Sequence, residues 1–316
     1  MWHLALLLIL SILLNPSYPL TPLPPNISPY SPPNPSLTSS TILSTISKAL
    51  SQSLTSSHKK LEIEFPPLLL NSKSNFDDFD NIQELDLNKD FTVKLASFNE
   101  DIKRLGKSCW LLYPDLKELE TTSSTWTGKT YSIPTSTTLE AAYLHLNPPP
   151  PYVSPWGSSI AKTFSGIIYD PLKTTKTALG DTSYLQELIN KPTLMIFVQP
   201  GNGGPVEDWI NLSNIGDEST TCVINGALDK VTSSYYPDVF FPRLGKVKGW
   251  YGDFERVFYL KAVSDKGVYG WVYRVFPEEW QVVKQKVVEG EVEDEVVWRG
   301  ERKPDYEQAV EYLLRG

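Results

Sequence analysis

The sequence predicts an α/β fold: a single three-layer domain with a mixed sheet, in which parallel βαβ units precede a C-terminal antiparallel meander and a terminal helix. Two apolar runs, 194–198 and 221–224, have the length and composition of strands covered on both faces. Between them lie a glycine-rich turn and Pro205, which suits the first position of a helix over 206–212. A connection that contains a helix favours a parallel crossover, whereas the β-branched and aromatic C-terminal third favours antiparallel strands.

The length and charge of the chain limit its class. With 316 residues, of which 41% are hydrophobic, the chain can bury a large core. Three of its 29 basic side chains lie in residues 1–61, whereas all 37 acidic side chains follow, so that the remainder carries a net charge of about −11. Because a nucleic-acid binder needs a basic face to neutralise phosphates, we expect no nucleic-acid partner.

The N-terminal residues have the composition of a two-part targeting leader. Residues 4–14 are apolar apart from Ser11, which is too short for a membrane span and typical of a signal-peptide core. Nine of the 21 residues from 15 to 35 are proline, and 13 of the 22 residues from 36 to 57 are Ser or Thr. The domain organisation that we expect is a signal-peptide-like segment at 1–20, a Pro/Ser-rich transit region at 21–38 and the α/β domain at 39–316.

Such a bipartite leader resembles those of algae whose plastid is wrapped in extra membranes. It predicts import into the plastid, to the chloroplast stroma or the thylakoid surface. The alternative is a secreted protein with a Ser/Thr/Pro-rich stalk.

The domain is expected to open with a helix and a strand. Apolar residues recur at helical spacing from Ile42 to Leu54, and the run 60–65 alternates charged with apolar residues before it stops at Pro66. The acidic stretch 76–90 lacks the ligand spacing of a calcium-binding EF-hand, so we expect a solvated loop there.

A second helix and strand follow. Apolar residues near a 3.6 period predict a helix over 91–105, which Gly106 ends, and the apolar run 108–113 predicts a strand. The Thr-, Ser- and Pro-rich stretch 121–184 predicts a long excursion with one strand at 163–169.

The C-terminal third predicts the meander and the last helix. Turn signals separate four strand-like runs, at 254–263, 268–276, 282–288 and 292–298. Pro304 then opens an amphipathic helix with apolar residues at Tyr306, Ala309, Val310 and Leu313.

The cysteines and histidines argue against a metal or redox site. Cys109 and Cys222 each lie in an apolar strand-like run, so we expect reduced core residues, with a disulfide or a reactive pair as the alternative. Outside the leader only His58 and His145 occur, which are too few for a histidine-based site. We therefore expect neither a metal nor a cofactor.

The strongest candidate for a ligand site is the loop Gly201, Asn202, Gly203 and Gly204. It joins the end of a parallel strand to a helix N-terminus, where α/β folds bind anions. The loop is neither a Walker loop nor a G-x-G-x-x-G motif, so glycines that serve a tight turn are the alternative. The polar candidates beside it are Asn225, Asp229, Lys230 and Arg274. The motifs G-x-S-x-G, H-E-x-x-H and C-x-x-C are absent from the sequence, and no catalytic residue is predicted.

A second candidate is an interaction patch within residues 235–251. Its aromatic and basic side chains are Tyr235, Tyr236, Phe240, Phe241, Arg243, Lys246, Lys248 and Trp250. Exposed aromatic rings beside lysines would contact a partner or a membrane surface, whereas buried loop anchors are the alternative.

Several stretches together resemble one known family. They are VQPGNGGPVEDW at 198–209, NGALDK at 225–230, the Tyr-Tyr-Pro and Phe-Phe-Pro pairs at 235–242, and DKGVYGW with PEEWQV at 265–282. They resemble the plastid and cyanobacterial family known as domain of unknown function nineteen-ninety-five. The stretch LEIEFPP at 61–67 resembles the start of that domain, and the resemblance covers about residues 39–316.

The resemblance mainly implies a location. The family is chloroplast-associated, and its best understood land-plant relative is a low-photosystem-II-accumulation factor that assists photosystem II assembly at the thylakoid. It has no established active-site residues, so none is carried over. We therefore expect a non-enzymatic assembly or scaffold factor, with photosystem II subunits or assembly factors as partners and a peripheral thylakoid contact. The alternative is an enzyme that binds a nucleotide or a phosphorylated metabolite at the loop Gly201–Gly204.

Overall fold

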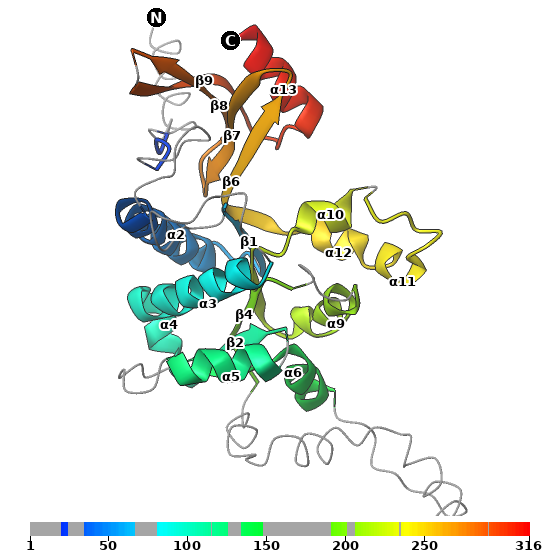
Figure 1. Ribbon diagram of the computed structural model, residues 1–316. Coiled ribbons are helices and arrows are strands. Elements are labelled where there is room, and N and C mark those ends of the chain that lie inside the picture. Colours follow the sequence, from blue (N-terminus) through cyan, green and yellow to red (C-terminus); the bar gives the residue numbers. More distant parts are fainter. Residues whose placement is uncertain are drawn as a thin grey trace, which may run out of the picture.

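A single mixed sheet forms the centre of the molecule (Figure 1). The computed structural model describes residues 20–24, 35–66, 81–114, 116–125, 134–147, 191–200, 206–233, 235–289 and 291–316. Within these ranges the strands are β1 (Lys60–Glu64), β2 (Cys109–Tyr113), β3 (Thr135–Thr138), β4 (Leu194–Val198), β5 (Thr220–Ile224), β6 (Glu255–Asp265), β7 (Val268–Val275), β8 (Trp280–Val288) and β9 (Glu291–Gly300).

The sheet has a parallel half and an antiparallel half. Its strand order is β3-β2-β4-β5-β1-β6-β7-β8-β9, and the pairs from β3 through β6 are parallel. Strands β6 to β9 then form an antiparallel meander. The predicted mixed α/β fold, with parallel units followed by a meander, is therefore confirmed.

Helices cover both faces of the parallel half. The helices α2 (Pro35–Thr55), α3 (Asn81–Phe98), α4 (Glu100–Leu105) and α5 (Leu116–Thr125) pack on one face. The opposite face carries α6 (Leu139–Leu146), α9 (Glu207–Ile215), α10 (Leu228–Thr232), α11 (Pro242–Gly245) and α12 (Lys248–Gly252). Strands β2 and β4 are buried over their full length, as their continuous apolar runs require.

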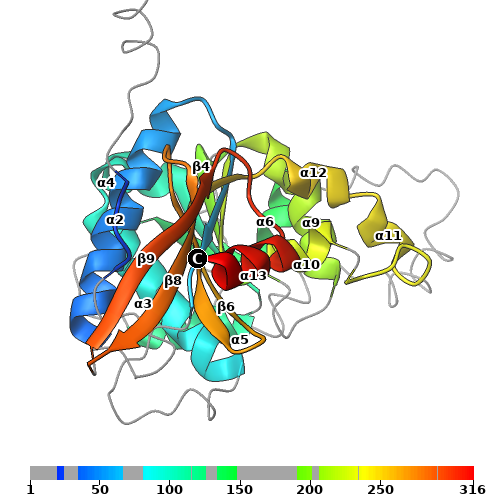
Figure 2. The same ribbon diagram turned by 90° about the horizontal axis from the view of Figure 1, so that it is seen from above.

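The last helix, α13 (Tyr306–Arg315), lies on the same face of the sheet as α10, over the meander (Figure 2). Its buried residues Ala309, Val310 and Leu313 contact β6, β7 and β8. Asp305 and Gln308 form a capping box at its start, which fixes the helix boundary predicted after Pro304.

The predicted helix over 91–105 differs from the structure. Helix α3 begins at Asn81 and ends at Phe98, and α4 begins after Asn99. The Asn99 side chain accepts a hydrogen bond from Ile102 N at 3.0 Å, which caps α4, and its amide group donates to Ser47 of helix α2. A side chain committed to a cap restarts the helix, and Gly106 ends α4 at a φ of 52°.

The middle of the chain also differs in part. The predicted excursion over 121–184 contains the end of α5, the strand β3 and the helix α6. Helix α6 begins after Thr138, whose side chain caps it by accepting a hydrogen bond from Ala141 N. The expected strand at 163–169 and residues 76–80 of the expected acidic loop lie outside the described residues. Residues 81–90 form the first part of α3 instead of a solvated loop, and Asn88 and Lys89 are buried there. Both cysteines are free and fully buried, and burial raises the pKa of each thiol, so they are inert core residues.

Candidate functional site

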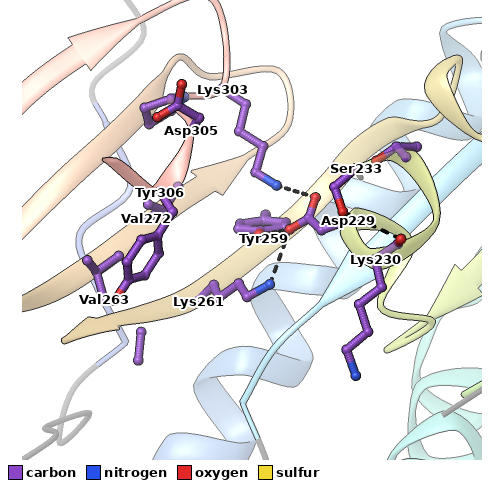
Figure 3. A pocket seen from close by; sticks show the side chains of 13 residues that line it. Asp229, Lys230, Ser233, Tyr259, Lys261, Val263, Val272, Lys303, Asp305 and Tyr306 are labelled. Atoms are coloured by element: carbon purple, nitrogen blue, oxygen red, sulfur yellow. Dashed lines mark hydrogen bonds and ion pairs between the residues drawn. The ribbon is translucent and has the colours of Figure 1, made fainter. Parts of the chain in front are cut away.

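A cavity of about 490 Å³ opens between helices α10 and α13, which lie on the same face of the sheet (Figure 3). Helix α10 packs on the parallel half through Leu228 and Val231, whereas α13 packs on the meander. The gap between them is lined by strand β6, helix α10 and the segment that leads into α13. Its side chains include Asp229, Tyr259, Lys261, Val263, Val272 and Lys303.

Asp229 lies at the centre of this cavity and accepts three hydrogen bonds. The Lys303 ammonium group donates to Oδ1, and the Tyr259 hydroxyl donates to Oδ2. Lys261 Nζ also donates to Oδ2, at 3.3 Å. Burial alone would raise the pKa of the Asp229 carboxyl, but the charge and hydrogen bond of Lys303, with Tyr259 and Lys261, hold it well below the usual range. Asp229 is therefore an ionised acceptor throughout the physiological pH range.

Lys303 is the most enclosed cation of the site. Burial lowers its pKa, and the neighbouring Asp229 carboxylate opposes this effect. Its Nζ also lies 4.2 Å from the centre of the Tyr259 ring, which is a cation–π contact. The ammonium group is thus fixed by a carboxylate and an aromatic face at once.

Two glutamates of the central strand lie behind Asp229. Glu62 is fully buried, and Arg256 Nε lies 2.6 Å from its Oε2 without the alignment of a hydrogen bond. Burial raises the pKa of Glu62, and burial together with the Glu62 charge raises the pKa of Glu64 to about 8. Within the described part of the chain, Oε2 of Glu64 is buried and has no hydrogen-bond partner. Glu64 therefore carries a proton at neutral pH.

The cavity suits binding better than covalent chemistry. The Asp229 carboxylate is occupied by three donors of its own chain. Lys261 is half-exposed at the rim and Val263 and Val272 form an apolar wall. Such a lining can hold the anionic group and the apolar body of a small molecule. Lys230 is on the rim, but Figure 3 shows its side chain directed away from Asp229, and its Nζ lies 5.9 Å from the Tyr235 ring.

The predicted glycine loop, Gly201 to Gly204, lies outside the described residues. Its two neighbours are described: β4 ends at Val198 and α9 begins at Glu207. The loop therefore joins the carboxyl end of a parallel strand to the start of a helix, as the sequence predicts.

Asn225 lies at the same edge of the sheet but not in the Asp229 cavity. Its Oδ1 accepts a hydrogen bond from Phe65 N at 2.8 Å, and its Nδ2 donates to Asn88 Oδ1 at 2.7 Å. Asn88 in turn donates to Gln199 Oε1 at 2.6 Å. This buried network joins β1, β4, β5 and α3, so the structure places Asn225 apart from Asp229 and Lys230.

Arg274 also lies outside the cavity. It forms an ion pair with Glu255 on the neighbouring strand, and its Nε donates to the Glu278 carbonyl oxygen at 3.0 Å. Its guanidinium group lies 5.4 Å from the Trp280 ring centre. These contacts hold the start of the meander together.

The aromatic residues of the predicted patch fall into two groups. Tyr236, Phe241 and Trp250 are half-buried, and the Tyr236 ring lies 5.0 Å from Phe241 and 5.6 Å from Trp209. Tyr235 and Phe240 are 64% and 76% exposed. Val239, which is 86% exposed, extends this second group. The first group anchors the segment, and the second faces solvent.

The basic residues of the patch also differ in their exposure and in their contacts within the chain. Lys248 Nζ lies 2.6 Å from Asp238 and donates to the Tyr236 carbonyl oxygen at 3.0 Å, so it holds the segment in shape. Arg243 is exposed, with Glu207 at 3.8 Å. Lys246 is exposed as well. The charges available to a partner are therefore those of Arg243 and Lys246.

Most of the cavity was not expected from the sequence, because Tyr259, Lys261 and Lys303 were not among the candidate residues. Glu62 and Glu64, which lie behind Asp229, were not expected either. A signal for Glu62 was present in strand 60–64, because both faces of a central parallel strand are covered and its middle residue is therefore buried. Lys303 had no local signal, because it reaches Asp229 from 74 residues further along the chain.

Two further findings concern the described residues. No described helix is both long enough and apolar enough to cross a membrane. The described side chains also contain no group of three or more His, Cys, Asp and Glu residues that could hold a metal ion.

Comparison with known proteins identifies one family. No curated protein and no solved structure matches the chain. A family model described as domain of unknown function (DUF1995) matches residues 38–311, which include all nine strands and the cavity around Asp229. The match covers most of the chain, and it agrees with the resemblance of the stretches at 198–209, 225–230 and 265–282. The chain therefore belongs to the DUF1995 family.

Proposed function

We propose that this chain is a non-enzymatic plastid protein that serves as an assembly or scaffold factor for photosystem II at the thylakoid. The observation that carries the proposal is the solvent-exposed group Tyr235, Val239 and Phe240, which stands beside Arg243 and Lys246. Exposed aromatic and aliphatic side chains next to cations are typical of surfaces that bind a protein partner or an anionic membrane.

The shape of this surface supports a defined contact. Trp209 fixes the segment, because the Tyr251 hydroxyl donates to the Trp209 carbonyl oxygen at 2.6 Å and the Trp209 ring packs on Tyr236. The Trp209 Nε1 group donates to the Gly226 carbonyl oxygen at 3.1 Å. These contacts hold the backbone of the segment in one conformation, so its exposed side chains lose less entropy on binding.

The plastid and photosystem II parts of the proposal come from the resemblance and from the leader composition. A chain with an acidic body is repelled by an acidic thylakoid surface, so a local basic and aromatic contact is needed for attachment. We propose the peripheral contact at the exposed part of residues 235–251.

Co-sedimentation of the full chain with thylakoid membranes tests the proposal. The double variant Val239→Ser/Phe240→Ser should weaken membrane binding at least tenfold, because burial of each apolar side chain contributes about 1.5 kcal/mol or more and about 1.4 kcal/mol is a factor of ten in affinity. Arg243→Glu/Lys246→Glu should weaken it as well and remove its salt dependence. We avoid Lys248, because its reversal would break the contacts with Asp238 and Tyr236.

The matched control changes exposed apolar residues elsewhere. Val287 and Val292, on β8 and β9, are 54% and 39% exposed. The variant Val287→Ser/Val292→Ser should sediment like the unchanged chain. Equal sedimentation of all these variants would rule out the surface at 235–251 as the attachment site.

The second candidate function is an enzyme that binds a nucleotide or a phosphorylated metabolite at Gly201–Gly204. It is favoured by one observation, the position of this loop between the end of β4 and the start of α9. Glu207 and Asp208 in the first turn oppose it. A ligand at 100 times its Kd would add about 2.7 kcal/mol to the free energy of unfolding. A thermal shift with ATP, NAD or a sugar phosphate that Gly203→Val abolishes would favour the enzyme.

A further inference from the structure

A short segment of the leader, Leu20–Pro24, packs against the meander. Figure 1 draws it as the isolated blue stretch near the N-terminus. The Thr21 N–H donates to Glu278 Oε2 at 2.7 Å, and the Thr21 hydroxyl donates to the other oxygen of the same carboxylate. Leu23 is 8% exposed and belongs to the core on the face covered by α2. This contact was not expected from the sequence, because the composition of the segment is that of an unpacked leader.

Two carbonyl groups of the segment also accept hydrogen bonds. The Tyr273 hydroxyl donates to the Pro22 carbonyl oxygen at 3.2 Å, and Gln281 Nε2 donates to the Thr21 carbonyl oxygen at 3.5 Å. A Thr-Pro-Leu-Pro sequence has few N–H groups and many carbonyl acceptors, because proline lacks the N–H. The protein supplies one acceptor for the Thr21 donors and two donors for successive carbonyls. This arrangement of donors and acceptors suits an extended peptide such as a proline-containing one.

The protein side of the contact is held by its own interactions. Tyr273 and Gln281 are 0% and 2% exposed. Glu278 N donates to the Val275 carbonyl oxygen at 2.7 Å, and Arg274 donates to the Glu278 carbonyl oxygen. Burial and the Glu278 charge raise the pKa of Tyr273, so its phenol remains a hydrogen-bond donor. The prolines also hold the peptide extended, so both sides lose little entropy on contact.

We propose that the notch formed by Tyr273, Glu278 and Gln281 is a recognition site for an extended Thr-Pro-Leu-Pro peptide, and that the chain's own segment 20–24 occupies it in cis. The tether gives the segment an effective concentration that is roughly millimolar, so a modest intrinsic affinity keeps the notch filled. This site is separate from the surface at 235–251 and does not depend on it. The occupant lies where the predicted transit region begins, so removal of that region would empty the notch.

The test uses a full-chain variant whose own segment 20–24 no longer binds the notch, called the opened chain, and adds the peptide as a separate molecule. Thr21→Pro removes both donors of the segment and Leu23→Asp removes its buried anchor. A fluorescent synthetic peptide of residues 18–26 is then titrated against this opened chain, with anisotropy as the readout. We expect saturable binding to the opened chain and at least tenfold weaker binding to the unchanged chain, where the cis segment competes.

Matched variants of two adjacent glutamates identify the site. Adding Glu278→Gln to the opened chain should weaken peptide binding at least tenfold, because the charged acceptor is lost. Glu279 is exposed, and Glu279→Gln should change the affinity less than twofold. Failure of the peptide to bind an opened chain with an unchanged circular dichroism spectrum would overturn the proposal, as would equal effects of the two changes.

Hydrogen exchange provides a second measurement if the opened chain does not fold. In the otherwise unchanged full chain the Thr21 amide should exchange more slowly than a free peptide amide, and Glu278→Gln should remove this protection. Glu279→Gln should leave it in place. An unprotected Thr21 amide in the unchanged chain would contradict occupancy of the notch.

Discussion

Lys261 Nζ lies 3.3 Å from Oδ2 of Asp229, and this ion pair joins strand β6 to helix α10. Lys303 approaches the other carboxylate oxygen from the segment before α13. One carboxylate thus connects the parallel half of the sheet, the meander and the last helix. Removing it would leave two lysines without their counter-charge.

Asp229→Asn should therefore lower the free energy of unfolding by about 2 kcal/mol, the scale of hydrogen bonds to a charged group. Denaturant unfolding measures the change. Lys230→Gln, at the exposed neighbouring position, is the control and should shift stability by less than about 0.5 kcal/mol. If Asp229→Asn were as stable as this control, the contacts of Lys261 and Lys303 with Asp229 would contribute nothing to the free energy of unfolding.

Glu64→Gln should change how stability depends on pH. The pKa of Glu64 is raised to about 8 in the folded chain from an ordinary value of 4.5, so the folded state binds the proton more tightly. Its contribution is fully present below pH 4.5 and is lost as the pH rises towards 8. The variant should lack this decline. Melting temperatures measured from pH 4.5 to 8.5 test it, and parallel curves for both chains would contradict the prediction.

Asp229 has the opposite pH dependence. Its pKa is lowered in the folded chain, so its contribution is present at pH values above its ordinary pKa of 3.8 and is lost as the pH falls through the folded value. We expect Asp229→Asn to destabilise the chain strongly at pH 7 and progressively less in acid. Unfolding curves at several acidic pH values measure the difference, and a destabilisation that grows in acid would refute the assignment.

Asn225→Ala should cost about 3 kcal/mol in the free energy of unfolding. The change leaves the Phe65 N–H and the Asn88 side-chain oxygen Oδ1 without the partners that Asn225 supplies, and it places alanine at a φ of 48°, which asparagine tolerates better. Asn214→Ala, on the exposed side of α9, is the matched control. Urea unfolding of both variants should separate them clearly, and similar midpoints would exclude a structural role for the network.

The two phenylalanines of the predicted patch should respond differently. Phe241→Ser should lower stability by about 2 kcal/mol, because the ring packs on Tyr236 within a half-buried group. Phe240→Ser should leave stability within about 0.5 kcal/mol, because that ring is 76% exposed. Thermal melting of the two variants measures the difference. Equal losses of stability would contradict the assignment of Phe241 to the half-buried group and Phe240 to the exposed group.

The strands were predictable because their apolar runs are local and long enough. The run 194–198 coincides with β4, and 221–224 lies within β5. The break at Asn99 was not predictable, because it depends on contacts with a helix about fifty residues earlier. The alternation of charged and apolar residues over 60–65 predicted a strand, but it did not predict that β1 lies inside the sheet between β5 and β6, where Glu62 is buried.

The candidate site was predictable only in part. Asp229 and Lys230 were expected at the edge of the sheet, and both line the cavity. Lys261 and Lys303 come from a strand and a loop that no local pattern relates to Asp229. Such a site depends on tertiary structure, so sequence periodicity alone does not reveal it.

The position of β1 in the sheet has a consequence for folding. This strand comes first in the chain, yet its neighbours β5 and β6 come more than 150 residues later, as the hydrogen bond between Phe65 and Asn225 across 160 positions illustrates. Contacts so distant in sequence slow folding, because a large loop must close before they form. During synthesis β1 therefore has both edges unpaired until β5 and β6 have been made. Unpaired strand edges are prone to aggregation, so the growing chain carries this risk until those strands are available.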